Sequence, residues 1–72
     1  MTIGEKIKNR RKELGYSQEK LGELSGLTQS QVSLFERSIS YPYVPTLILL
    51  CKVLGLTPNF LLGFEDATLP AN

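Results

Sequence analysis

Residues 17–37 read SQEKLGELSGLTQSQVSLFER, and this stretch carries the signals of two short helices in close succession. Ser17 is a residue type that caps helix starts through its side-chain oxygen, so it predicts a helix over Gln18–Leu24. The apolar residues expected on the inner face of this helix are Leu21 and Leu24.

The second helix follows after a very short connection. Gly26 is expected to end the helix Gln18–Leu24, and Thr28 with Gln31 forms a capping-box pattern. These signals predict a helix over Gln29–Arg37. Its inward-facing residues are expected to be Val32 and Phe35. Two short helices around a tight, glycine-containing turn are typical of a helix-turn-helix.

The same kinds of signal predict three more helices. Thr2 and Glu5 form a capping-box pattern before the first, Pro45 begins the fourth, and Thr57 with Pro58 begins the fifth. The predicted ranges are Ile3–Leu14, Thr46–Leu54 and Asn59–Leu62. The apolar residues expected in the core are Ile3, Ile7 and Leu14 in the first helix and Leu47, Ile48, Leu50, Cys51 and Leu54 in the fourth.

Five helices without a strand candidate predict an all-α fold. The segment Ser38–Val44 contains a proline and two tyrosines, and it is expected to be an ordered loop. A chain of 72 residues is long enough for one domain only. We expect a single helical domain over residues 1–64 and a C-terminal tail over residues 65–72.

The composition argues against several classes of function. The chain has no histidine, and its single cysteine, Cys51, cannot form an internal disulfide, so we expect no metal and no cofactor. No nucleophile with a matching base and no phosphate-binding glycine loop is visible, which predicts that the protein is not an enzyme and has no evident small-molecule ligand. No apolar run reaches the roughly 18 residues of a membrane span, so we expect a cytoplasmic protein.

The charges are unevenly distributed, although the net charge is only +1. The first twelve residues hold a single acid, Glu5, against five bases. A local basic patch on the first helix is therefore predicted, which suits an anionic partner such as nucleic acid. The five bases are Lys6, Lys8, Arg10, Arg11 and Lys12.

The outer face of the predicted helix Gln29–Arg37 is rich in uncharged hydrogen-bonding groups. If Val32 and Phe35 point inward, helical spacing turns the opposite side outward. Amide and hydroxyl side chains can bond to base edges in the major groove of DNA. Leu34 has two open interpretations, contact with a thymine methyl group or packing against a neighbouring loop. The residues of this face are Gln29, Ser30, Ser33, Leu34 and Arg37.

Several motifs in unbroken order carry a resemblance to a known family. They are SQEKL at 17–21, SGLTQSQVS at 25–33 and FER at 35–37, and they continue through Pro42, Leu47, Leu50, LGL at 54–56 and FLLG at 60–63. With these motifs the sequence resembles the lambda-type repressor and Cro family, also called the XRE family, over about residues 3–63. The resemblance implies a compact five-helix fold that binds operator DNA as a symmetric homodimer and regulates transcription, usually as a repressor.

The resemblance also implies roles for individual residues. Gln29 matches a glutamine that contacts a base, and Ser30, Ser33 and Leu34 match positions that face the groove. Gln18 matches a glutamine that binds phosphate. Arg11 and Glu36 match an ion pair that orients the recognition helix and lets Arg11 share a phosphate. The other expected phosphate contacts are Ser17, Thr28, Arg10, Arg37, Ser40 and Tyr41.

Three positions depart from the family pattern. Arg10 stands where the family often has an apolar residue, and we expect it to extend outward to a phosphate. Gly22 replaces a usual alanine, which lowers helix propensity by about 1 kcal/mol but permits close packing. Ser38 replaces a common glycine, so the sequence leaves the geometry after the recognition helix open.

The C-terminal part of the chain supplies a candidate dimer surface. Its apolar residues are expected to serve the dimer in part, and the alternative assigns Phe60 and Leu61 to the core. Two modules about 34 Å apart could read half-sites one helical turn apart. The candidate dimer residues are Phe60, Leu61, Phe64 and Leu69.

A protein-interaction module that has lost DNA contact is the alternative function. The low net charge and the absence of Lys and Arg from the loop Ser38–Val44 favour it. Double-stranded DNA remains the predicted partner, because the helix-turn-helix pattern is long and continuous.

Overall fold

The computed structural model describes residues 1–64, and all of the elements in that part of the chain are helices. The predictions made for residues 65–72, including Leu69, lie outside the described residues. The helices are α1 (Ile3–Glu13), α2 (Gln18–Ser25), α3 (Gln29–Glu36), α4 (Val44–Leu54) and α5 (Pro58–Leu62). The all-α fold class is therefore confirmed, and each helix boundary lies within two residues of its predicted position.

The capping signals of the sequence are present in the structure. Thr2 and Thr28 each form a complete capping box, and the side chains of Ser17 and Thr57 accept a backbone hydrogen bond at the starts of α2 and α5. The helix ends differ slightly from the prediction because Leu14 caps α1 instead of extending it. Helix α4 starts at Val44, so that a proline occupies its first turn.

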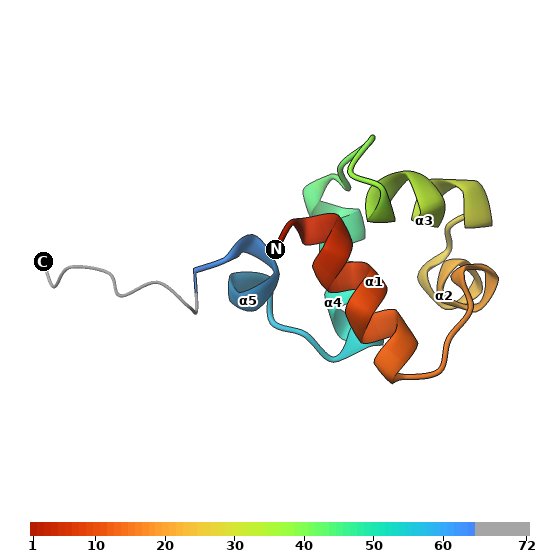
Figure 1. The fold of residues 1–72 in the computed structure, drawn as a ribbon, viewed down its shortest axis with the longest axis horizontal. Helices are drawn as coiled ribbons and strands as arrows, with labels where there is room; N and C mark the ends of the chain where they lie inside the picture. Colours follow the sequence, from red (N-terminus) through yellow and green to blue (C-terminus); the bar gives the residue numbers. More distant parts are fainter. Residues whose placement is uncertain (65–72) are drawn as a thin grey trace, which may run out of the picture.

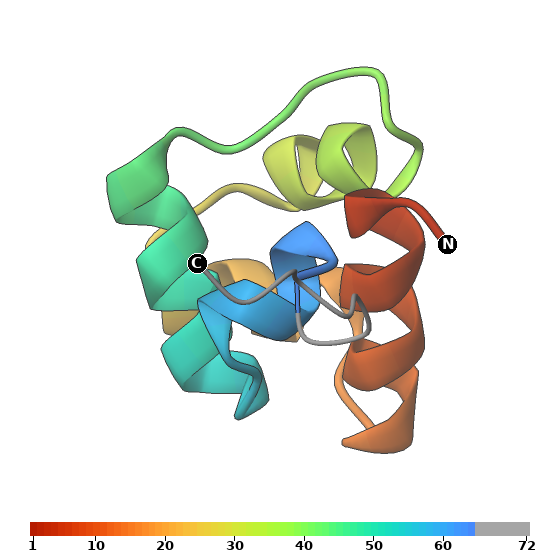
Figure 2. The same ribbon diagram turned by 90° about the vertical axis from the view of Figure 1, so that its left-hand side faces the viewer.

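The helices pack around one small core. Helix α3 contacts α1 and α2, whereas α5 contacts α1 and α4 on the other side of the domain (Figure 1). Figure 2 shows α3 lying across one end, with α1 and α4 flanking α5. None of the helices in residues 1–64 is both long and apolar enough to cross a membrane. The buried core residues are Ile7, Leu21, Val32, Leu47, Leu50, Cys51, Leu54 and Leu61.

Three residues that were predicted to be buried are exposed instead. Leu14 is 36% exposed because α1 ends before it. Leu24 is 45% exposed, since the buried face of α2 is formed by Leu21, Gly22 and Ser25 and is turned away from it. Ile48 is 40% exposed because it lies about 100° around α4 from the buried stripe that begins at Leu47.

The inner face of α3 is less uniform than the sequence predicts. Val32 is fully buried, whereas Phe35 is only partly buried and packs against the edge of the core. The helix is nevertheless anchored in the predicted orientation, because Val32 fixes its inner side.

Two glycines allow backbones to meet closely around α3. A Cβ atom on Gly4 would lie 2.7 Å from the carbonyl oxygen of Glu36, so α1 rests directly on the end of α3. A Cβ on Gly22 would lie 2.6 Å from the carbonyl oxygen of Leu27, which belongs to the turn. The close packing expected of Gly22 is therefore present, and a larger residue would push the turn away from α2.

The chain leaves α3 through a left-handed residue. Ser38 has φ of 60°, a conformation that glycine adopts without the penalty of about 1–2 kcal/mol that other residues incur. The Ser38 hydroxyl donates to the Thr2 hydroxyl at 3.3 Å, which links this turn to the start of α1. Ser38 thus keeps the backbone geometry of a glycine at this position.

Leu50→Ala and Ile48→Ala form a matched pair that tests the core. We expect Leu50→Ala to lower the free energy of unfolding by about 2–5 kcal/mol, because it empties a fully buried site. Ile48→Ala should cost less than about 1 kcal/mol, because its side chain is largely solvated. Urea denaturation followed by circular dichroism measures both, and equal losses would contradict the packing of α4.

Candidate nucleic-acid interface

The outer face of α3 and the start of α2 border one shallow, solvent-open hollow. Five of its residues come from α3 and the position that caps it, and the sixth is the first residue of α2. The expected base-reading face thus lies beside one of the expected phosphate-binding residues. The lining residues are Gln18, Gln29, Ser30, Ser33, Leu34 and Arg37.

The starts of α2 and α3 present backbone donors next to this hollow. Ser17 accepts from the backbone N–H of Lys20 at 2.9 Å, and Thr28 accepts from that of Gln31 at 3.1 Å. The first N–H groups of each helix lack partners within the helix and carry the positive end of its dipole. Gln18 and Gln29 are the first residues of these helices, so both helix starts can bind an anion.

A buried ion pair connects α1 to the end of α3. Arg11 Nε donates to Glu36 Oε2 at 2.6 Å, and Arg11 Nη2 donates to Glu36 Oε1 at 3.1 Å. Arg11 Nη1 also donates to the carbonyl oxygen of Tyr16 at 2.7 Å. The side chains of Arg11 and Glu36 are 10% and 2% exposed, respectively. The guanidinium group of Arg11 is therefore buried and bonded within the protein. This differs from the expectation that Arg11 shares a phosphate.

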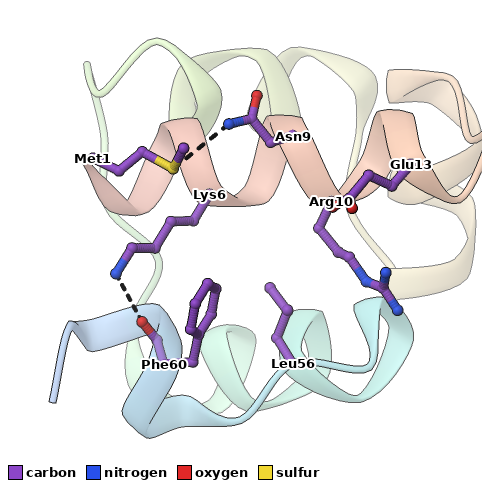
Figure 3. Close-up of a pocket in the computed structure, with 7 residues that line it drawn as sticks. All are labelled: Met1, Lys6, Asn9, Arg10, Glu13, Leu56 and Phe60. Atoms are coloured by element: carbon purple, nitrogen blue, oxygen red, sulfur yellow. Dashed lines mark hydrogen bonds between the residues drawn. The ribbon is translucent and has the colours of Figure 1, made fainter. Parts of the chain in front are cut away.

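Two further bases of α1 are directed away from α3. Lys6 Nζ donates to the carbonyl oxygen of Phe60 at 2.8 Å and lies 4.9 Å from the centre of the Phe60 ring. Arg10 Nε donates to the carbonyl oxygen of Leu54 at 2.8 Å. Figure 3 shows both side chains extending from α1 across a pocket toward α4 and α5. They stabilise the C-terminal ends of these helices, where cations are favoured.

The prediction that the five bases of α1 form one exposed basic patch is therefore wrong. Of its five bases, Lys6, Arg10 and Arg11 bond within the protein, and only Lys8 and Lys12 are exposed. A sequence shows where charges lie along a helix, but it does not show which of them satisfy carbonyl groups of distant elements. The expectation that Arg10 extends outward is wrong for the same reason.

The remaining residues of α3 have defined surroundings. Arg37 is exposed, and its Nε donates to the Ser33 hydroxyl at 3.2 Å. Leu34 is half-buried and borders both the hollow and a second groove toward the loop after α3. Ser40 and Tyr41 line that second groove and not the hollow. Leu34 thus packs near the loop and still keeps part of its surface free.

The expected dimer residues separate into different environments. Leu61 is fully buried in the core, so its assignment to the surface was wrong, because α5 needs it to contact α1 and α4. Phe60 is half-buried beneath Lys6, and Phe64 is 54% exposed.

Burial raises the pKa of the Cys51 thiol, which keeps this residue protonated within the core.

Comparison with known proteins identifies the family. The profile of a family described as helix-turn-helix matches residues 7–61. The chain belongs to the lambda-type helix-turn-helix family. Within this helix-turn-helix family, the chain is 40% identical over 67 residues to the HTH-type transcriptional regulator DicA of Escherichia coli K12. It is also 38% identical over 60 residues to the repressor protein C2 of Salmonella phage P22.

These relatives are longer proteins than the chain. The match to DicA covers 92% of this chain and 50% of DicA, and the match to C2 covers 83% of this chain and 28% of C2. The crystal structure of the P22 c2 repressor with a synthetic operator superimposes with a TM-score of 0.85 at 36% identity. That match covers 89% of this chain and 97% of the solved helix-turn-helix chain.

Two features of this helix-turn-helix domain were missed in the sequence. Gly4 was not singled out, although an isolated glycine inside a helical pattern is itself a sign of close packing. The hydrogen bond from Gln18 Nε2 to Glu36 Oε1, at 3.2 Å, has no signal in a single sequence because it joins residues from separate helices.

Arg11→Met and Lys12→Met test the ion pair with a matched control. Arg11→Met leaves the Glu36 carboxylate buried without its partner, and we expect it to lower the free energy of unfolding by about 3–5 kcal/mol. Lys12→Met removes the same charge from an exposed site and should change this free energy by less than about 0.5 kcal/mol. Urea denaturation measures the free energy of unfolding of both variants. Similar losses for the two variants would argue against the ion pair.

Proposed function

We propose that this chain is a sequence-specific DNA-binding regulator of transcription that acts as a repressor, with α3 as its recognition helix. The observation that carries this proposal is the hollow between α2 and α3, which gathers amide and hydroxyl side chains on an exposed surface. The P22 c2 repressor, whose solved chain is matched over 97% of its length, supports it because that structure contains a synthetic operator.

In this proposal α3 enters the major groove and reads base edges. Gln29 has both a donor and an acceptor and suits the paired groups of adenine. Ser30 and Ser33 suit single hydrogen bonds, and the free part of Leu34 suits a thymine methyl group. Because Arg37 Nε occupies an acceptor position of the Ser33 hydroxyl, the proton of that hydroxyl is available for a base acceptor.

Phosphate contacts come mainly from the two helix starts. Ser17, Gln18 and Thr28 lie at those starts beside unpaired backbone N–H groups. Arg37 adds an exposed positive charge at the other end of α3. Ser40 and Tyr41 would contact phosphate groups of the DNA from the loop after α3. Arg10 and Arg11 are left out of this set, because their guanidinium groups bond within the protein.

The chain is proposed to bind as a homodimer in the cytoplasm. A single module of this size makes few phosphate contacts, and a second copy on a neighbouring half-site doubles them. Phe64 and the free part of Phe60 are the described apolar groups available to such a dimer.

Duplex binding at increasing salt tests the function directly. We expect the chain to bind a random duplex with an affinity that falls as salt rises, since each neutralised phosphate contributes about −0.9 to the log–log slope. Selection of duplexes from a random pool should then yield a two-fold symmetric site. Binding that is absent or independent of salt, measured by fluorescence anisotropy, would refute DNA binding and favour a protein-interaction module.

Gln29→Ala tests base reading. We expect it to weaken binding to the selected duplex by about 1–3 kcal/mol and to relax the preference at one base pair, because a specific contact is lost. Binding to random duplex should change little. Equal weakening on both duplexes would show that Gln29 does not read a base.

Arg37→Ala and Lys52→Ala test which surface meets phosphate. Each variant removes one exposed positive charge, but only Arg37 lines the hollow. We expect Arg37→Ala to reduce the steepness of the salt dependence by about 1, whereas Lys52→Ala should leave it unchanged. Equal effects of the two substitutions would mean that net charge, and not the α3 surface, governs the interaction.

A further inference from the structure

The carboxylate of Glu36 has three donors around it, from two different helices. Arg11 supplies two of them, and the third is Nε2 of Gln18 at 3.2 Å from Glu36 Oε1. The Glu36 side chain is almost completely buried. Its negative charge is therefore reached only from inside the protein, through Arg11 and Gln18.

This arrangement determines how the Gln18 amide is turned. An ionised carboxylate can only accept hydrogen bonds, so the nitrogen of the amide, and not its oxygen, must face Glu36. The amide nitrogen carries two protons, and one of them is donated in the hydrogen bond to Glu36. Gln18 is half-buried, lines the hollow and is the first residue of α2. The second N–H is not bonded to Glu36, and it belongs to a residue at the start of α2, where the first backbone N–H groups lack partners within the helix.

The geometry points to Glu36 as a positioning residue for the DNA contact of Gln18. Glu36 holds one N–H of the amide, so that the other N–H is presented to a phosphate together with the backbone donors of α2. This inference rests on the proposed DNA-binding function. It assigns to a buried acid, which by charge alone repels DNA, a favourable contribution to DNA binding.

The role of Glu36 can be separated from its ion pair with Arg11. Glu36→Asp keeps the charge but withdraws the carboxylate by one methylene, which lengthens its bonds to Arg11 and to Gln18. Gln18→Met keeps the length of the other side chain and removes its donor. If Glu36 acts on DNA through Gln18, the effect of Glu36→Asp on affinity must disappear once Gln18 is Met.

The decisive experiment is a double-mutant cycle of affinity for a random duplex at one salt concentration. We expect Gln18→Met to weaken binding about three- to tenfold, with an unchanged salt slope because no charge is lost. Glu36→Asp should weaken binding to a similar extent in the wild-type background and have little effect in the Gln18→Met background. Equal weakening in both backgrounds would assign the effect to Arg11 and overturn the inference.

A second measurement needs neither DNA nor an altered fold. In the ¹⁵N–¹H spectrum of the free wild-type chain, we expect the two side-chain amide protons of Gln18 to be more widely separated and slower to exchange than those of Gln29. Gln29 is exposed and serves as the internal reference. Equal separation and exchange for the two residues would overturn the positioning of Gln18, even where Glu36→Asp fails to fold.

The outcomes distinguish this inference from the function on which it rests. A wild-type chain that binds no duplex overturns the proposed function, and with it the DNA contact of Gln18. A chain that binds DNA but has a freely exchanging Gln18 amide overturns the positioning alone.

Discussion

The contact between Arg11 and the Glu36 carboxylate is the interaction on which the arrangement of α1, α2 and α3 depends. It joins the last residue of α3 to the last turn of α1, and Gln18 extends it to the start of α2. Burying such a pair is weak evidence for stability, because desolvation offsets the attraction between the charges. Its consequence is geometric, since the direction of α3 is fixed relative to both neighbouring helices. The backbone contact at Gly4 reinforces the same junction.

The distribution of charge follows from how a small domain satisfies its helix ends. Lys6 and Arg10 donate to carbonyl groups near the ends of α5 and α4, where an α-helix leaves its last carbonyl groups without the usual partner within the helix. The surface around α3 is consequently polar but weakly charged. In the proposed function, such a surface would discriminate between DNA sequences through hydrogen bonds to base edges more than through general attraction to phosphate. This agrees with a chain whose net charge is only +1.

Local signals made most of the fold predictable, and non-local contacts account for the errors. The capping residues Thr2, Ser17, Thr28 and Thr57 act within three residues of themselves, so the sequence locates the helix starts well. Leu24 and Ile48 were misassigned because the buried arc of a helix depends on its neighbours, and a short apolar run does not show where that arc is centred. The outward face of α3 was predicted from Val32 and Phe35, of which Val32 is fully buried, whereas the partners of Arg10 and Gln18 required the packed structure.

The central claim is that the exposed face of α3 and the start of α2 form one surface for DNA. Titration of the ¹⁵N-labelled chain with a short duplex, followed by amide chemical shifts, tests it most directly. The account predicts that the largest changes fall on the first residues of α2 and along α3, with little change at Ile48 and Lys52 on the outer side of α4. Changes concentrated on α4 or α5, with α3 unaffected, would contradict it.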